Sequence, residues 1–416
     1  MISSAVPAGP GKEVDRPRIV SVSKFMPYGA VLHAGGQYVQ LHDEALARFA
    51  RVEHLVPDNE VNRMAMAHPT RTVPGALMRG VGPGGDGRLS ALMDLESAWS
   101  RSAIAFPYRR LFHTERGPWD LLRSADAIEL HWSEMIALAP LLRARLPSTP
   151  LVGVAHDVIS QRWERAAAAE RSPLRRTAYA MAARRSVPGE RSSFGVLDRL
   201  LVFSRKDADI AARLSPTAHV EVVYPGLGPS EPSLRRPDPV EPTVLFTGAL
   251  SRNDNWRSAM WFIDEVWPRI LSRVPAAKLV LAGAHPPPQL SALVQNTANA
   301  ELTGVVDSLE PYYSRATVFV APLLSGAGVK FKTIDAMLRG VPVVATPVGA
   351  EGIEAEELFA RITNDPSEFG DAVVSVILDG DGGRGEKASR WADSIYGRAA
   401  FMARIRDVYD SILPLS

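Results

Sequence analysis

Short apolar runs alternate with segments of helical periodicity throughout the second half of the chain. The segments between the runs, such as 258–273 and 332–339, repeat apolar residues every three or four positions, as helices packed on a sheet do. This alternation predicts a doubly wound parallel sheet. The predicted strands are Thr243–Thr247, Lys278–Ala282, Glu301–Thr303, Thr317–Ala321, Pro342–Thr346 and Ala360–Thr363.

The first half repeats the pattern less regularly and predicts a second doubly wound domain. Between the halves, residues 225–242 contain six prolines among glycines and serines, a composition that resists both helix and central strand. We therefore divide the chain into a disordered tail (1–16), an amino-terminal Rossmann-like domain (17–226), a linker (227–242), a carboxy-terminal Rossmann-like domain (243–390) and a last helical segment (391–416). That last segment either closes the second domain or crosses back to the first. The strands predicted in the first half are Ile19–Ser23, Ala127–Leu130, Leu151–Ala155, Leu200–Phe203 and Val220–Val223.

Composition excludes several classes of protein. Lys plus Arg number 47 against 46 Asp plus Glu, so no global charge attracts nucleic acid. The absence of cysteine excludes disulfides, thiolate nucleophiles and cysteine-based zinc sites, and it indicates a reducing compartment. The first 16 residues lack the apolar core of a signal peptide, and no apolar run approaches a membrane span. We expect a soluble cytoplasmic protein, and a surface loop without function at Arg79–Arg88.

A glycine-rich run follows the predicted strand Thr317–Ala321 and opens a helix. Glycines let backbone N–H groups approach a ligand, and the start of the helix directs further donors and a positive dipole to the same place, which suits a phosphate. Lys330 and Lys332 add cations for a diphosphate, and Asp335 is an acceptor suited to ribose hydroxyls. An ordinary turn with surface lysines is the alternative. The residues assigned to this loop are Gly326, Ala327, Gly328, Val329, Lys330 and Lys332.

The order of motifs around this loop resembles the group 1 (family four type) retaining glycosyltransferases. Ile334-Asp335-Ala336-Met337 is followed by Gly340-Val341-Pro342-Val343-Val344 and by Gly349-Ala350-Glu351-Gly352. The resemblance covers residues 243–365. Its upstream matches are Phe246-Thr247-Gly248, Asn255, Phe262-Ile263, Val266-Trp267-Pro268, Gly304-Val305-Val306-Asp307 and Pro311-Tyr312-Tyr313.

The resemblance implies the GT-B fold, in which two Rossmann-like domains face each other across a cleft. It implies transfer of a sugar from a nucleotide-diphosphate sugar to a hydroxyl of a glycan, a lipid-linked glycan or a small molecule, with retention at the anomeric carbon. No metal and no cofactor are expected, since the nucleotide sugar is a substrate. Polysaccharide biosynthesis is the expected context.

Two departures from the family pattern concern the diphosphate. The glutamates of the family hallmark fall on Ala327 and Asp335, and an upstream Arg and Lys of the family fall on Ala249 and Asn255. Burying the phosphate charges in an apolar pocket without cations would cost several kcal/mol, because unpaired buried charge is unfavourable. We therefore expect Lys330 to replace the missing cations and stabilise the leaving diphosphate, with Arg252 as a second candidate.

Other donor contacts are implied by the resemblance. Backbone at Val305 and Val306 is expected to hold the base, and Gly35 and Gly36 are expected to face the donor phosphate, although a tight turn without a ligand is the alternative there. Asp307 is expected to cap the helix 308–314. His156 ends a predicted strand where ligands meet doubly wound sheets, and we expect it to contact the transferred sugar. His131 competes for this role, and a structural role is open for both histidines.

Two further segments are ambiguous. The segment Gln161–Arg191 is rich in arginine and has aromatic and apolar residues between the charges. A solvated helical face is one interpretation, and a surface for anionic lipid or a phosphorylated acceptor, with peripheral contact at the inner face of the membrane, is the other. Asp379-Gly380-Asp381 matches an Asp-x-Asp metal motif, but its glycine neighbours indicate a turn, so we assign no metal.

Three other functions compete with glycosyl transfer. A catalytically inactive GT-B partner or nucleotide-sugar-binding subunit would explain the loss of typical contacts at Ala249, Asn255 and Ala327. An epimerase or hydrolase would need an acidic pair in the cleft, and no matching positions supply one. A nicotinamide-dependent oxidoreductase would need Gly-x-Gly-x-x-Gly after a first strand, which neither half contains.

Overall fold

The computed structural model describes residues 16–27, 34–66, 74–78, 106–113, 118–170, 172–227, 241–325 and 329–413. The predicted tail (except residue 16), the loop Arg79–Arg88, most of the predicted linker and residues 326–328 lie outside these ranges. The described chain forms two compact units. Unit 1 comprises Met1–Phe203, Asp207–Val223 and Arg404–Ser416, and unit 2 comprises Ser204–Lys206 and Tyr224–Ala403.

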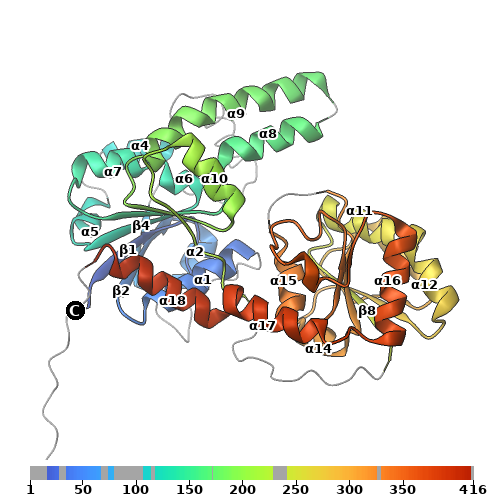
Figure 1. Cartoon of the computed structure of the whole chain (residues 1–416). Coiled ribbons are helices and arrows are strands. Elements are labelled where there is room, and N and C mark those ends of the chain that lie inside the picture. Colours follow the sequence, from blue (N-terminus) through green and yellow to red (C-terminus); the bar gives the residue numbers. More distant parts are fainter. Residues whose placement is uncertain are drawn as a thin grey trace, which may run out of the picture. The chain divides into compact units, whose positions relative to one another are not determined.

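Unit 1 is built on a seven-stranded parallel sheet in the order β3-β2-β1-β4-β5-β6-β7 (Figure 1). The order reverses between β1 and β4, where Ile19 pairs with Ala127. The strands are β1 Arg18–Val22, β2 Arg51–Pro57, β3 Gly75–Met78, β4 Ala127–His131, β5 Leu151–Ala155, β6 Arg199–Val202 and β7 Val220–Val222. The helices before β7 are α1 Ala34–Leu46, α2 Glu60–Met66, α4 Phe106–His113, α5 Trp119–Arg123, α6 Ser133–Ile136, α7 Ala139–Arg145, α8 Ile159–Ala169, α9 Pro173–Phe194 and α10 Arg205–Leu214.

Two strands of unit 1 were not predicted from the sequence. β2 begins Arg-Val-Glu-His, and its charged residues hide the apolar pattern of a buried strand. His54 is nevertheless buried, because its ring nitrogen Nε2 lies 2.8 Å from Asp43 Oδ1. β3 has only four residues and lies at the edge of the sheet. The paired polar residues of β2 and the shortness of β3 therefore conceal the apolar pattern by which strands are predicted.

Unit 2 is built on a six-stranded parallel sheet in the order β10-β9-β8-β11-β12-β13. Its strands match the six predicted runs to within two residues at each end and confirm the doubly wound sheet. They are β8 Thr243–Thr247, β9 Lys278–Ala282, β10 Ala300–Leu302, β11 Val318–Ala321, β12 Val343–Ala345 and β13 Arg361–Ile362. The helical elements are α11 Asn253–Trp261, the π-helical turn Phe262–Val266, α12 Trp267–Arg273, α13 Pro288–Gln295, α14 Glu310–Arg315, α15 Phe331–Leu338, the 3₁₀ turn Glu356–Leu358, α16 Pro366–Asp379 and α17 Arg384–Tyr396.

Alternate residues of the unit 2 strands enter two separate cores, one on each face of the sheet. Val244 and Phe246 of β8 pack with the side chains of α11, α12, α13 and α16. Leu245, between them, belongs to the core formed with α14, α15 and α17. Both faces of the sheet are therefore buried, and the carboxyl edge of the strands is left for a ligand.

The last helical segment is two helices rather than one. α17 ends at Tyr396, Gly397 has an extended backbone, and α18 follows at Arg398–Asp410. The chain returns to unit 1 at Arg404, within α18. In the described part of the chain, no helix combines the length and the apolar composition needed to cross a membrane.

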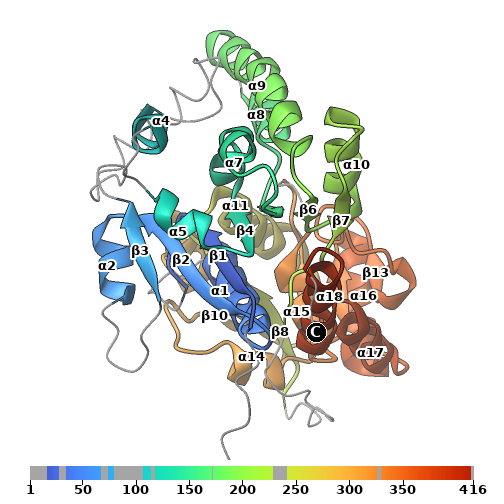
Figure 2. The same cartoon turned by 90° about the vertical axis from the view of Figure 1, so that its left-hand side faces the viewer.

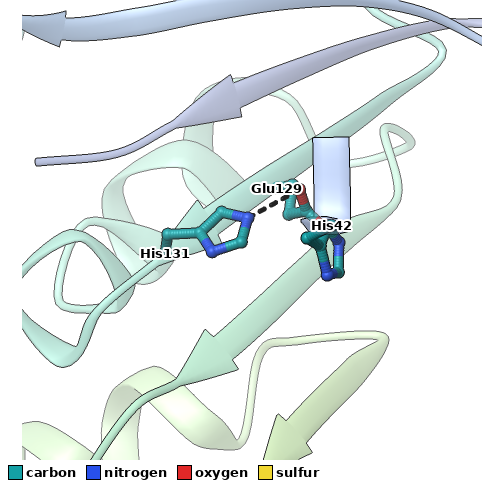
Figure 3. A group of neighbouring side chains, drawn as sticks. All are labelled: His42, Glu129 and His131. Carbon is teal, nitrogen blue, oxygen red and sulfur yellow. Dashed lines mark hydrogen bonds and ion pairs between the residues drawn. The ribbon is translucent and has the colours of Figure 1, made fainter. Parts of the chain in front are cut away.

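A buried carboxylate joins three elements of unit 1 (Figure 3). Glu129 on β4 is fully buried, and its two oxygens accept from the Nε2 atoms of His42 on α1, at 2.6 Å, and His131 on β4, at 2.9 Å. The Tyr409 hydroxyl on α18 donates to the same oxygen as His42, also at 2.6 Å. The carboxylate therefore ties the first helix and the last helix to the centre of the sheet.

The network keeps Glu129 ionised in spite of its burial. Burial by itself acts to raise the pKa of the carboxyl, but the attraction of His42 and His131 and their hydrogen bonds hold its pKa well below the usual value of 4.5. Burial also lowers the pKa of His131 and outweighs the attraction of Glu129, so the His131 ring is neutral. Its Nδ1 atom is buried and has no hydrogen-bond partner among the described residues.

Replacing Glu129 by Gln should lower the free energy of unfolding by about 1–3 kcal/mol at neutral pH, because an amide leaves buried donors unsatisfied. The folded-state pKa of Glu129 is depressed, so its stabilisation is complete above the unfolded-state pKa and is lost as pH falls through the folded-state pKa. The difference between wild type and Glu129→Gln should therefore shrink as pH is lowered from about 7 to about 3 in urea unfolding. Glu164→Gln, at an exposed position on α8, is the control. An equal difference at every pH would contradict this role.

Candidate donor-diphosphate site

The carboxyl ends of β8 and β11 meet where the strand order of the unit 2 sheet reverses. The order β10-β9-β8 runs one way and β11-β12-β13 the other, so the loops after β8 and β11 diverge from this point. Doubly wound sheets bind ligands in the crevice at such a switch point. The loop after β8 contains Gly248, and the loop after β11 leads through residues 326–328 to Lys330 and α15.

Lys332 of α15 crosses to β8 and α11 and contacts one side chain of each. Its Nζ donates to Asn255 Oδ1 at 2.6 Å and lies 4.7 Å from the centre of the Phe246 ring, a cation–π distance. Asn255 is fixed in turn, because its amide donates to the Ala249 carbonyl at 2.8 Å. Gly248 has a φ of +153°, and a Cβ there would lie 2.8 Å from Lys332 Nζ. Only glycine therefore allows the lysine to come this close.

The environment of Lys332 makes its ammonium group easy to deprotonate. Burial, followed by the nearby cations Arg252 and Lys330, lowers the pKa of Lys332 to about 7, although Asp254 acts in the opposite direction. A polyanion placed at this point would favour the protonated form. Among the residues described, no carboxylate oxygen lies within 4.0 Å of Lys332 Nζ, and its hydrogen-bond partner is the amide of Asn255.

Lys330 was expected to provide a cation for the diphosphate, but in the structure it is paired with a carboxylate. Its side chain is 8% exposed, and its Nζ donates to Glu351 Oε2 at 3.2 Å. Glu351 belongs to the turn Gly349–Gly352, and Gly352, with a φ of +81°, leaves room for Val329 against its backbone. Thr333 of α15 fastens this turn by donating to the Gly349 carbonyl at 2.9 Å. Glu351 was missed as a partner, although the glycine turn that carries it was part of the sequence motif.

Asp335 also has a partner in the structure. Arg339, one turn later on α15, donates to Asp335 Oδ1 at 3.0 Å and to Glu310 Oε2 on α14 at 2.8 Å. The guanidinium lies 4.6 Å from the centre of the Tyr313 ring. Arg339 therefore fixes the start of α14 against α15, and Asp335 remains half-buried at the side of the loop.

The other residues predicted to bind the donor lie in several parts of the chain. Arg252 is exposed at the start of α11, and Val305 is 68% exposed beside the half-buried Val306. The prediction that Asp307 caps the next helix is wrong: α14 begins at Glu310, whose N–H donates to Ser308 Oγ at 3.1 Å. Gly326, Ala327 and Gly328 lie outside the described residues. Gly35 and Gly36 fall in the first turn of α1, and their contacts are not described.

In unit 1, aromatic rings surround the predicted sugar contact His156. Its ring stacks on Trp132, with centroids 4.2 Å apart and planes 13° apart, and Tyr38 and Phe203 meet it edge-on. Trp132, directly after β4, has a φ of +68°, a strained conformation for a bulky residue. Sequence reasoning missed Trp132, because no pattern signals a left-handed residue. His131 is 1% exposed and bonded to Glu129, which accounts for it as a structural histidine.

Charged residues flank these rings at the carboxyl edge of the unit 1 sheet. Lys24, after β1, donates to Glu134 Oε1 at 3.0 Å. Burial acts to raise the pKa of Glu134, but Lys24 outweighs it, so the pKa is lowered. Asp157, next to His156, has its pKa raised by burial. The sequence offered no signal for the Lys24–Glu134 pair, because 110 residues separate the partners.

Two groups of side chains bear on metal binding. Asp381 accepts from the N–H groups of Gly383, at 2.9 Å, and Gly385, at 2.6 Å, so it caps α17, while Asp379 accepts from Ser375. His42, Glu129 and His131 have potential ligand atoms within 4.8 Å of one another. The hydrogen bonds of the carboxylate to both rings and to Tyr409 account for that group without a metal.

Comparison with known proteins identifies the carboxy-terminal domain. Residues 241–379 match the family model described as Glycosyl transferases group 1. A protein of Klebsiella pneumoniae described as "Uncharacterized 44.6 kDa protein in cps region" is 28% identical over 189 residues, which is 43% of this chain and 47% of that protein. The match therefore spans about half the length of that relative.

Solved structures match over almost the whole chain. Sucrose-phosphate synthase from Thermosynechococcus elongatus superimposes with a TM-score of 0.66 at 17% identity, covering 96% of this chain and 100% of that one. HepE from Anabaena, in complex with UDP and glucose, gives a TM-score of 0.59 at 12% identity, with 95% and 100% coverage. Identities this low show the fold alone. The chain therefore has the GT-B fold, and its residues 241–379 are similar to the group 1 glycosyltransferases.

Proposed function

We propose that the protein is a glycosyltransferase that moves a sugar from a nucleotide-diphosphate sugar to a hydroxyl acceptor. The observation that supports this most directly is the meeting of Gly248, Asn255 and Lys332 at the switch point of the unit 2 sheet. There, a cation partly removed from water lies beside Asn255 and the end of β8. HepE, which shares the fold, was solved with UDP-glucose, and we propose a donor of that class here.

In the proposed mechanism, unit 2 stabilises the leaving diphosphate electrostatically. The bond between the anomeric carbon and the diphosphate oxygen breaks, the acceptor oxygen bonds to that carbon on the same face, and the acceptor proton passes to the leaving phosphate oxygen. Lys332, Lys330 and the start of α15 supply positive potential where negative charge develops. Backbone at Val305 and Val306 holds the base, and Asp335 accepts from the ribose. Retention, independence of metal and the absence of a cofactor are parts of this proposal.

An inactive nucleotide-sugar-binding subunit is the second reading. Ala327 and Ala249 support it, because neither side chain can bind a phosphate or a sugar hydroxyl. The lowered pKa of Lys332 supports binding of an anionic ligand in both readings, because a bound polyanion would stabilise the charged form of a partly buried lysine. Turnover therefore separates them. We further propose a cytoplasmic protein in polysaccharide biosynthesis. The acceptor is a glycan, a lipid-linked glycan or a small molecule.

Incubation with a panel of nucleotide-diphosphate sugars tests the proposal. At least one donor should release its nucleoside diphosphate, faster with an acceptor hydroxyl present, as measured by a coupled nucleotide assay. Activity should persist after treatment with EDTA. Donor binding by calorimetry without any release would instead identify the inactive subunit.

Donor affinity should fall as pH rises through about 7, because only the protonated form of Lys332 attracts the diphosphate. A nucleotide sugar is the right probe, since a terminal phosphate itself titrates near about pH 6. Calorimetry between about pH 6 and pH 8.5 should show a loss of up to about tenfold per pH unit above the pKa. Lys332→Met should bind weakly at every pH, whereas Lys387→Met, at an exposed lysine of α17, should behave as wild type. An unchanged pH profile in Lys332→Met would contradict the assignment.

Lys330→Ala should lower kcat by about 10²-fold, the size of effect expected when one group that stabilises a leaving anion is removed. The double variant Lys330→Ala/Glu351→Gln separates two explanations. If Lys330 acts on the diphosphate, the double variant stays as slow as the single one. If Lys330 only neutralises Glu351, removing the carboxylate restores turnover. Donor affinity and turnover unchanged in Lys330→Ala would exclude either role.

A further inference from the structure

Helices α8 and α9 form a two-helix arm that extends beyond the rest of unit 1 (Figures 1 and 2). From Arg171 to Gly189 the sequence contains five arginines and no acidic residue. The whole chain has a formal charge of only +1, so this positive charge is a local feature. The glycosyltransferase site does not use it.

The arm is fixed at its base and along its inner side. Glu190, near the end of α9, accepts from the Ile159 N–H at 2.6 Å and so holds the start of α8. Burial raises the pKa of Glu190 to about 7. Phe194 enters the main core of unit 1, and Tyr179 of α9 stacks on Trp163 of α8 with centroids 5.6 Å apart. The two helices are therefore held together at the base of the arm and along its inner side.

The outer side of α9 presents apolar and basic side chains together. No residue of 173–181 is buried, and Leu174 is 84% exposed and Met181 41% exposed. Leu174, Thr177, Met181 and Arg184 follow one another at intervals of three, four and three residues, so they share one face of the helix. Leu174 and Met181 are thus exposed on one face of α9, with Arg184 at one side of that face and Arg175 at the other.

The arginines of this surface make no ion pair with the residues that the structure describes. Arg162, at the base of the arm, pairs with Asp157 at 3.3 Å. Arg175, Arg176 and Arg184 are exposed, and none of the described carboxylates lies within 4.0 Å of them. Their charge is therefore available to an external anion.

We propose that the α8–α9 arm docks on an anionic lipid bilayer, with Leu174 and Met181 entering the interface and Arg175 and Arg184, on either side of them, contacting lipid phosphates. Arg176, on the opposite side of α9, adds to the positive charge of the arm. Two features of α9, its arginines that pair with no described carboxylate and its exposed apolar side chains, together favour a bilayer as the partner. Basic residues near an anionic membrane add attraction that salt screens, and the two apolar side chains gain free energy only where acyl chains receive them. A nucleic-acid backbone would use the arginines but would leave Leu174 and Met181 in water. A merely solvated face would bind neither.

Co-sedimentation of the full chain with vesicles tests the proposal. Vesicles of phosphatidylglycerol and phosphatidylcholine in equal parts should retain the protein, and vesicles of phosphatidylcholine alone should not. Raising the salt from about 50 mM to about 500 mM should release most of it, because the Debye length shortens severalfold.

Two variants separate the charge from the apolar contact. Arg175→Glu/Arg176→Glu/Arg184→Glu should lower the affinity for anionic vesicles by at least about tenfold, given the attraction that each basic residue supplies. Leu174→Ser should weaken binding at every salt concentration without changing the slope of its salt dependence. The matched control is Arg48→Glu/Arg110→Glu/Arg213→Glu, which makes the same charge change at exposed positions off the arm. Circular dichroism checks that all variants fold.

Several outcomes would overturn the proposal. Docking on an anionic bilayer would be contradicted if wild type failed to bind anionic vesicles at low salt. Equal binding to neutral and anionic vesicles would contradict it as well. Equal weakening by the arm variant and the control variant would mean that overall charge matters and the arm does not. Salt-sensitive binding of the arm to duplex DNA, without binding to vesicles, would assign it to nucleic acid.

Discussion

The ammonium group of Lys332 can reach the end of β8 only because residue 248 has no side chain. A Cβ at Gly248 would stand 2.8 Å from that nitrogen and 3.0 Å from the amide nitrogen of Asn255. This close approach joins the loops after β8 and β11, which otherwise diverge at the switch point. At this place, burial and the cations Arg252 and Lys330 lower the pKa of Lys332, and the Ala249 carbonyl orients Asn255. The geometry of the candidate site thus depends on one glycine with a positive φ.

The fold of unit 2 could be predicted because its signals are local. Each strand of unit 2 is a short apolar run, and the helices between them repeat apolar residues every three or four positions. The predicted strand boundaries therefore nearly coincide with the observed ones. β2 and β3 of unit 1 lack such signals. The polar residues of β2 are buried through partners elsewhere in the chain, such as Asp43 for His54, and pairing of that kind leaves no pattern in the strand itself.

The site was predicted in part for the same reason. Glycines and lysines at fixed spacing predicted a phosphate loop, and the structure brings Gly248, Asn255 and Lys332 together. The pairing of Lys330 with Glu351 was not predicted, because it depends on how a turn 21 residues away folds back on α15. The strained backbone of Trp132 was not predicted either, and its ring contacts with His156 and Phe25 join residues distant in the sequence.

The donation of the Tyr409 hydroxyl to Glu129 has a consequence for the order in which the chain assembles. During synthesis, domains usually fold one after another from the amino terminus. Here the carboxylate at the centre of the unit 1 sheet receives its third donor from a helix that the ribosome makes after the whole of unit 2. The nascent amino-terminal unit must therefore wait, with a buried charge incompletely satisfied, while the unit behind it is translated and folds. In this chain, the domain that is made first is finished last.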